Sequence, residues 1–145
     1  MSSRAIINRA IASFCENNAI ASFQLDDDGL ACLRMADGRQ VFLVHAAEDD
    51  RFFAMTELRK LPDDPELGLA FLQIAMGLNF LQQGTGPATL ALKGRGLFCQ
   101  CEVAIETMDA NSLGLGMAVV VEQGKLIGAA LAQMVRAHAE SLADV

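Results

Sequence analysis

The first apolar pattern in the chain repeats every three or four residues. Ile7, Ile11 and Phe14 recur at this spacing within residues 3–17, so one face of the segment is apolar and the other polar. A serine at position 2 or 3 can cap the start, and the Asn17-Asn18 pair can end it. The pattern predicts an amphipathic N-terminal helix.

Three short strand-like runs follow this helix, and acidic turns separate them. The first run ends at Leu25, and the next two cover residues 30–35 and 40–46. An Asp-Gly pair precedes each of the last two runs, which is a strong hairpin signal because glycine adopts the positive φ of a tight turn. Residues 51–58 fit either a further strand or the lead into the next helix. We therefore expect three strands joined by tight turns.

The segment after these strands has the clearest helix boundaries in the chain. Asp64 can act as the N-cap, Pro65 fits the first helical position, and Gly84 can close the far end. Between them lies LGLAFLQIAMGLNFLQQ, which is apolar nearly all round. A helix without a polar face must be buried on more than one side. Because the sheet can cover only one side, we expect a second copy of the chain to cover the other, in a homodimer.

Two more strands and a final helix complete the expected fold. Residues 88–92 and 97–105 predict a hairpin about the turn at residues 93–96. Residues 126–138 are helical by their apolar spacing, but the region before them is ambiguous, because three consecutive valines favour a strand while nearby glycines weaken a helix. The order α-β-β-β-α-β-β-α predicts an α+β fold with an antiparallel sheet, in one domain spanning residues 1–145.

Charge and composition narrow the class of partner. The chain has a net charge of −7, and 52% of its residues are hydrophobic. An acidic surface repels phosphate backbones, so we expect no nucleic-acid partner. The most apolar stretch is interrupted by Gln73 and Asn79 and falls short of the ~20 residues of a membrane span, and the N-terminus lacks the apolar core of a signal peptide. We expect a cytoplasmic protein without membrane insertion.

Side chains that could carry chemistry are few. Cys99 and Cys101 would face the same side of a strand, as small hydrophobic residues do, and the four cysteines contain no C-x-x-C. His45 lies in an alternating run and is interpreted as half-buried and structural. The acidic turns do not have the spacing of a calcium loop, and the glycine pairs lack the lysine of a phosphate loop. We expect no catalytic residue, no metal site, no cofactor and hence no enzyme.

Several local motifs occur in an order that resembles a known family. They are LDDDG at residues 25–29 before a strand, the Asp-Gly turn at 37–38, Leu58 and Leu61-Pro62 before the second helix, LNF at 78–80 and GPATLAL at 86–92. Together with the element order and the acidic chain of about 15 kDa, they resemble the class I type III secretion chaperones, the Tir chaperone family.

The resemblance implies a homodimer in the bacterial cytoplasm that binds an unfolded N-terminal segment of a secreted effector. Members of the family keep that segment extended and secretion-competent without nucleotide. The implied effector contacts, on the first helix and the sheet, are Ile7, Ile11, Phe14, Phe23, Leu25 and Leu33. The implied dimer contacts, on the second helix and the next strand, are Leu69, Leu72, Met76 and Leu90. For each of these side chains, packing in the protein's own core is the alternative.

A second class of function stays open. A dimeric regulatory scaffold of the profilin-like α/β kind also combines helices with an antiparallel sheet. Such a scaffold would bind a folded partner, whereas a secretion chaperone would bind a disordered segment. The state of the partner therefore distinguishes the two.

Overall fold

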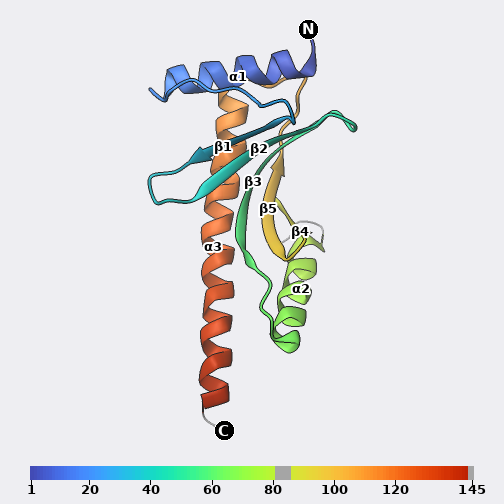
Figure 1. Cartoon of the computed structure of the whole chain (residues 1–145), viewed down its shortest axis with the longest axis vertical. Helices are drawn as coiled ribbons and strands as arrows, with labels where there is room; N and C mark the ends of the chain where they lie inside the picture. Colours follow the sequence, from blue (N-terminus) through green and yellow to red (C-terminus); the bar gives the residue numbers. More distant parts are fainter. Residues whose placement is uncertain (81–85, 144–145) are drawn as a thin grey trace.

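The computed structural model describes residues 1–80 and 86–143, which hold three helices and five strands. The predicted order α-β-β-β-α-β-β-α and the α+β class are confirmed (Figure 1). The elements are helix α1 (Ser3–Asn17), strands β1 (Leu30–Arg34), β2 (Gln40–Ala46) and β3 (Arg51–Lys60), helix α2 (Pro65–Asn79), strands β4 (Thr89–Lys93) and β5 (Gly96–Glu102), and helix α3 (Ala110–Ala143).

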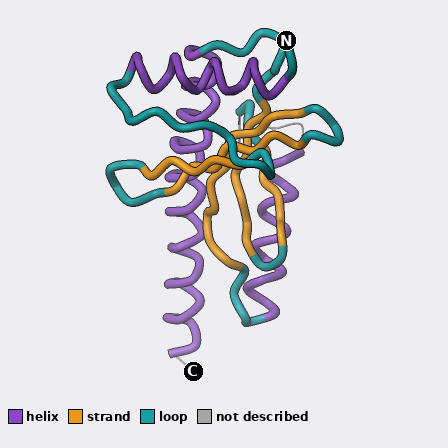
Figure 2. The backbone as a smooth tube through the Cα atoms, turned by 45° about the horizontal axis from the view of Figure 1, so that its top comes forward, coloured by secondary structure: helices purple, strands orange, loops and turns teal. Residues whose placement is uncertain are grey.

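All five strands form one antiparallel sheet in the order β1-β2-β3-β5-β4. Alternation along β2 places Val41 and Leu43 on one face and Phe42 and Val44 on the other. The first face is buried, because α3 packs against β3 and β5 there and α1 crosses one end of α3 (Figures 1 and 2). Residues 51–58, which fitted two interpretations, belong to strand β3.

One predicted strand is wrong. The run ending at Leu25 has no strand structure, because side chains of α1 bind the backbone groups that a strand would use. The side-chain oxygen of Asn8 accepts the N–H of Leu25 at 3.1 Å, and the Arg4 guanidinium donates to the carbonyl of Leu25 at 2.9 Å and to that of Asp26. The segment therefore follows α1 instead of extending the sheet.

Helix α3 resolves the ambiguous end of the chain. It is continuous over 34 residues and includes the three valines that favoured a strand. Its buried side chains recur every three or four residues, so a single apolar stripe faces the sheet. Gly116 lies on this stripe, and a Cβ atom there would be 2.6 Å from Cγ2 of Val103. The glycine thus permits a close approach of the helix to the residues that follow β5.

Helix α2 begins as the sequence predicts. Asp64 is its N-cap, and its side chain accepts the N–H of Leu67 at 2.9 Å. The helix ends at Asn79, with Phe80 as its C-cap. The predicted end at Gly84 lies outside the described residues.

The length and hydropathy of α3 alone would suit a membrane span. Its most apolar window has a mean hydropathy of 1.4, and a third of that window is buried within the protein. The buried part contacts the sheet and α1.

Candidate functional site

The face of the sheet opposite the helices carries an apolar groove of about 300 Å³. All of its lining residues belong to strands, and no helix in the described ranges covers them (Figure 2). Cross-strand pairing brings them together, since Leu30 pairs with Val44 and Phe42 pairs with Met55. Strands β4 and β5 complete the groove. Its lining residues are Leu30, Phe42, Val44, Met55, Ala91, Lys93, Phe98 and Gln100.

An apolar ligand that bound in the groove would bury its surface away from water. An exposed contiguous apolar surface on a soluble protein marks a binding site more often than an isolated exposed side chain does. Leu30 leads into the groove from the edge of the sheet and is 43% exposed. At the far end of the same face, Arg51 stacks over the ring of Phe53 and forms a 2.7 Å ion pair with Glu102. The hydrogen bond from Arg51 lowers the pKa of Glu102.

The two outer strands of the sheet differ in whether a side chain binds their outer edge. Among residues 1–80 and 86–143, strand β1 pairs with β2 alone, so its outer edge can accept an extended chain. Strand β4 is blocked in part by the side chain of Asn79. Its amide donates to the carbonyl of Leu90 at 2.8 Å and accepts the N–H of Leu90 at 2.7 Å.

Helix α2 has a second apolar surface, on the side turned away from the sheet. Met76 is 75% exposed there, and Leu69 and Phe80 are also exposed. Between α2 and α3 lies an apolar cavity of about 260 Å³, to which Ile74 and Leu126 contribute. The prediction that α2 lacks a polar face therefore corresponds to an apolar surface that no other described part of the chain covers.

The residues expected at the effector contact occupy two kinds of position. Ile7, Ile11 and Leu25 are buried in the core, the first two with no exposed area. Phe14, Phe23 and Leu33 are half-buried and pack against that core. All six therefore lie within or beside the core that the helices cover, and none of them lines the open groove.

The residues expected at the dimer contact are also divided. Leu69 and Met76 are exposed on the outer side of α2, and Leu72 is half-buried. Leu90 is buried beneath α2, with 6% of its surface exposed. Only the first three could touch another molecule in this conformation.

Sequence reasoning missed the residues that line the open groove. A signal was present, since residues 41–44 of β2 are Val-Phe-Leu-Val, apolar on both parities. A strand that is apolar on both faces has two faces to cover, and here the helices cover one.

Cys99, Cys101 and His45, which the sequence singled out, all lie on strands. Cys99 and Cys101 both face the core, as their spacing predicts, and burial raises the pKa of the Cys99 thiol to about 11. His45 lies 3.1 Å from the carboxylate of Asp50. The pKa of Asp50 is lowered mainly by a hydrogen bond from Ser3 and, to a smaller extent, by one from His45. In residues 1–80 and 86–143, no three His, Cys, Asp or Glu side chains are grouped to hold a metal ion.

Comparison with known proteins assigns the chain to a family. The sequence model of the Tir chaperone protein (CesT) family matches residues 9–127, from α1 into α3. The chain belongs to this family. It is therefore a class I type III secretion chaperone, as the sequence motifs indicated. No curated protein sequence matches the chain.

Solved structures with this fold include complexes of such chaperones. The ExsC–ExsE complex contains a chain that aligns with a TM-score of 0.74 and 16% identity, over 90% of this Tir-family chaperone and 97% of that chain. The HopA1–SchA chaperone–effector complex gives a TM-score of 0.68, 18% identity and coverages of 85% and 93%. The Yersinia pestis type III secretion chaperone SycH, in complex with a fragment of YscM2, aligns with a TM-score of 0.62 and 13% identity. The alignment covers 86% of this chain and 98% of that chain.

Proposed function

We propose that this chaperone binds the N-terminal segment of a secreted effector in the bacterial cytoplasm and keeps it extended and competent for secretion. It acts by binding alone, without catalysis, metal or nucleotide. Membership of the Tir chaperone family supports this assignment, and two of the similar solved structures are named as complexes of a type III secretion chaperone or a chaperone with an effector.

The open apolar groove on the sheet carries the proposal. Its apolar lining includes Phe42, Val44, Met55 and Phe98. An extended segment that runs over the sheet can place alternate apolar side chains in the groove, while its backbone can pair with the free edge of β1. A groove of this volume is less suited to a folded effector domain, because the groove admits only a few side chains.

Calorimetry with two parts of a secreted protein tests the proposal. The probes are the N-terminal fragment and the folded C-terminal part of the secreted protein encoded by the neighbouring gene. We expect only the N-terminal fragment to bind, with a negative heat-capacity change from apolar burial. If only the folded part binds, the protein is a regulatory scaffold of the profilin-like kind and the chaperone proposal is wrong.

A variant with a matched control locates the site. Leu30→Asp introduces a charge at the entrance of the groove, and because burying a leucine contributes about 1.5–3 kcal/mol, we expect the fragment to bind at least ~10-fold more weakly. Leu115→Asp places the same charge at an exposed position of α3, 68% exposed and outside the groove, and should leave binding unchanged. Equal losses in both variants would remove the groove from the proposal. The variant Ile11→Asp is unsuitable, because Ile11 is fully buried.

We further propose that the chaperone is a homodimer joined through the outer side of α2. Exposed Leu69 and Met76 support this arrangement, since a second copy would cover them. Met76→Asp should shift the dimer towards monomer, because an unpaired charge buried in an interface costs several kcal/mol. Light scattering at micromolar concentration measures this, with Leu115→Asp as the control. A mass of 15.5 kDa for the unmodified protein across that range would refute the dimer.

A further inference from the structure

A second cavity, of about 710 Å³, lies where strands β2 and β3 separate. Their pairing extends only as far as Phe42 and Met55, although the hydroxyl of Thr56 still donates to the carbonyl of Gln40 at 2.8 Å. A β-bulge at Leu58 then shifts the register of β3 against β5. Bulges bend a strand and redirect its side chains, and this one borders the cavity.

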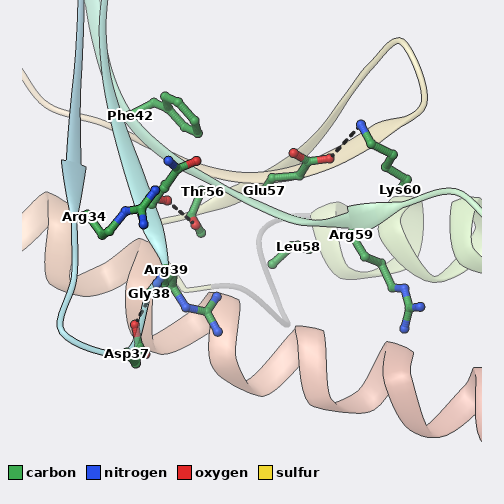
Figure 3. Close-up of a pocket in the computed structure, with 11 residues that line it drawn as sticks. Arg34, Asp37, Gly38, Arg39, Phe42, Thr56, Glu57, Leu58, Arg59 and Lys60 are labelled. Atoms are coloured by element: carbon green, nitrogen blue, oxygen red, sulfur yellow. Dashed lines mark hydrogen bonds and ion pairs between the residues drawn. The ribbon is translucent and has the colours of Figure 1, made fainter.

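The cavity gathers cations in a protein that is acidic as a whole. It is lined by four of the eleven lysines and arginines, although the net charge of the chain is −7. Figure 3 shows Arg34 and Arg39 on the β1–β2 hairpin at one side, and Arg59 and Lys60 at the end of β3 on the other.

The two carboxylates in the lining are already paired. Glu57 lies 3.5 Å from Lys60, and Asp37 lies 3.9 Å from Lys125. The guanidinium groups of Arg34, Arg39 and Arg59 have no carboxylate partner among residues 1–80 and 86–143. Three arginines therefore remain available to an anion from outside.

The side chain of Arg39 has a hydrogen-bond donor that is not satisfied among the described residues. Its Nε is shielded from solvent and has no hydrogen-bond partner in the described part of the chain. A buried donor without a partner costs about 1–3 kcal/mol, so this position of Arg39 is held at a cost in free energy. The guanidinium is held against α3, where a Cβ atom at position 124 would lie 3.0 Å from its Nη1. Gly124 thus leaves the space that Arg39 occupies.

We propose that this cavity binds acidic side chains of the partner's segment, as a carboxylate site beside the apolar groove. This inference rests on the proposed function, since it assigns a second feature to the segment that the chaperone binds. Phe42 lines both the cavity and the groove, so the two adjoin where β2 and β3 separate. The guanidinium of Arg39 lies on the α3 side of this separation, so an extended segment reaches it by passing from the groove between the two strands (Figure 3). The partner is then a segment with an apolar part followed or preceded by Asp or Glu.

Carboxylates fit the cavity better than a nucleic-acid backbone does. The planar guanidinium group binds a carboxylate through two parallel hydrogen bonds. A long phosphate chain would extend beyond the cavity and be repelled by the acidic surface, whereas one or two carboxylates need only the local arginines. The binding should therefore weaken with salt, because it is partly electrostatic.

The first experiment needs no effector. A short oligo-L-glutamate peptide is titrated into the full chain and followed by NMR of the arginine Nε–Hε signals, with oligo-L-lysine and inorganic phosphate as parallel probes. We expect oligo-glutamate to shift the signal of Arg39. The double variant Arg34→Ala and Arg59→Ala should bind it about 10-fold more weakly, as expected for the loss of charge-assisted hydrogen bonds. The control, Arg9→Ala with Arg136→Ala, removes the same charge from exposed positions outside the cavity and should bind normally.

Each other outcome overturns the proposal. A shift with phosphate but not with oligo-glutamate makes the cavity a phosphate site, and equal losses in the two double variants make the effect one of overall charge. If no probe shifts the signals, the cavity is not an anion site.

A second measurement separates this inference from the chaperone function. The N-terminal effector fragment is prepared with its Asp and Glu residues changed to Asn and Gln. We expect the cavity variants to weaken binding of the unmodified fragment and to have no effect on the neutralised one. If the fragment binds but neither change matters, the carboxylate site is wrong and the chaperone function stands.

Discussion

Replacing Gly116 by alanine tests how closely α3 packs against the rest of the chaperone. The new Cβ atom would lie 2.6 Å from Cγ2 of Val103, whereas non-bonded carbon atoms prefer about 3.5–4.0 Å. Val103 is buried and β-branched, so it has little freedom to rotate away. The helix or the segment after β5 must move to accommodate the methyl group.

Two opposing effects set the size of the change. Overpacking of a core costs about 1–3 kcal/mol, while alanine stabilises a helix interior by about 1 kcal/mol relative to glycine. The variant should therefore be destabilised by about 0–2 kcal/mol. Gly128→Ala is the matched control, because it lies in the same helix and nothing comes within 4 Å of its new Cβ atom. It should be stabilised by about 1 kcal/mol.

Urea unfolding followed by circular dichroism measures both variants at one protein concentration, because a dimer would make the stability depend on concentration. The Gly128→Ala protein should exceed the Gly116→Ala protein by about 1–3 kcal/mol in its free energy of unfolding, the difference of the two expectations. If the two variants are equally stabilised, α3 does not approach Val103 this closely, and its seating on the sheet is wrong.

Three further predictions concern stability and reactivity. Asn79→Ala should lower the free energy of unfolding by about 1–3 kcal/mol, because the backbone N–H and carbonyl of Leu90 lose their partner; an unchanged urea midpoint would contradict this. In the native protein at neutral pH, a thiol reagent should label only Cys32, since the other three cysteines are buried; labelling of all four before unfolding would contradict the fold. Acid should destabilise the protein, because the helix-cap hydrogen bond from the N–H of Leu67 lowers the pKa of Asp64 below its ordinary 3.8. This contribution is complete above about pH 4 and is lost as the pH falls through the lowered value, so Asp64→Asn should flatten the acid limb of a plot of stability against pH.

The sequence by itself determined the local structure of this chaperone. Asp64 and Pro65 start α2 because a carboxylate beside free N–H groups and a fixed φ favour a helix start in any context. Gly29 and Gly38 take positive φ in the turns before β1 and β2, as the Asp-Gly pairs predict. These features depend on neighbours within a few residues, so the sequence contains all the information they need.

Elements that depend on distant residues could not be predicted in this way. The run ending at Leu25 looked like a strand, but Arg4 and Asn8 of α1 bind its backbone. The start of α3 was ambiguous because its glycines weaken a free helix, whereas in the fold Gly116 and Gly124 allow close packing.

The candidate site was decided by the tertiary structure. Periodicity shows which residues share a face, but it does not show which face the helices cover. Ile7 and Ile11 form the apolar side of α1, for which the sequence left open a contact with a partner or packing in the chain's own core. In the structure they are fully buried in that core. The uncovered face belongs instead to the groove beside Phe42. Arg39 and Arg59 lie twenty residues apart in the sequence, and only the separation of β2 from β3 places them around one cavity.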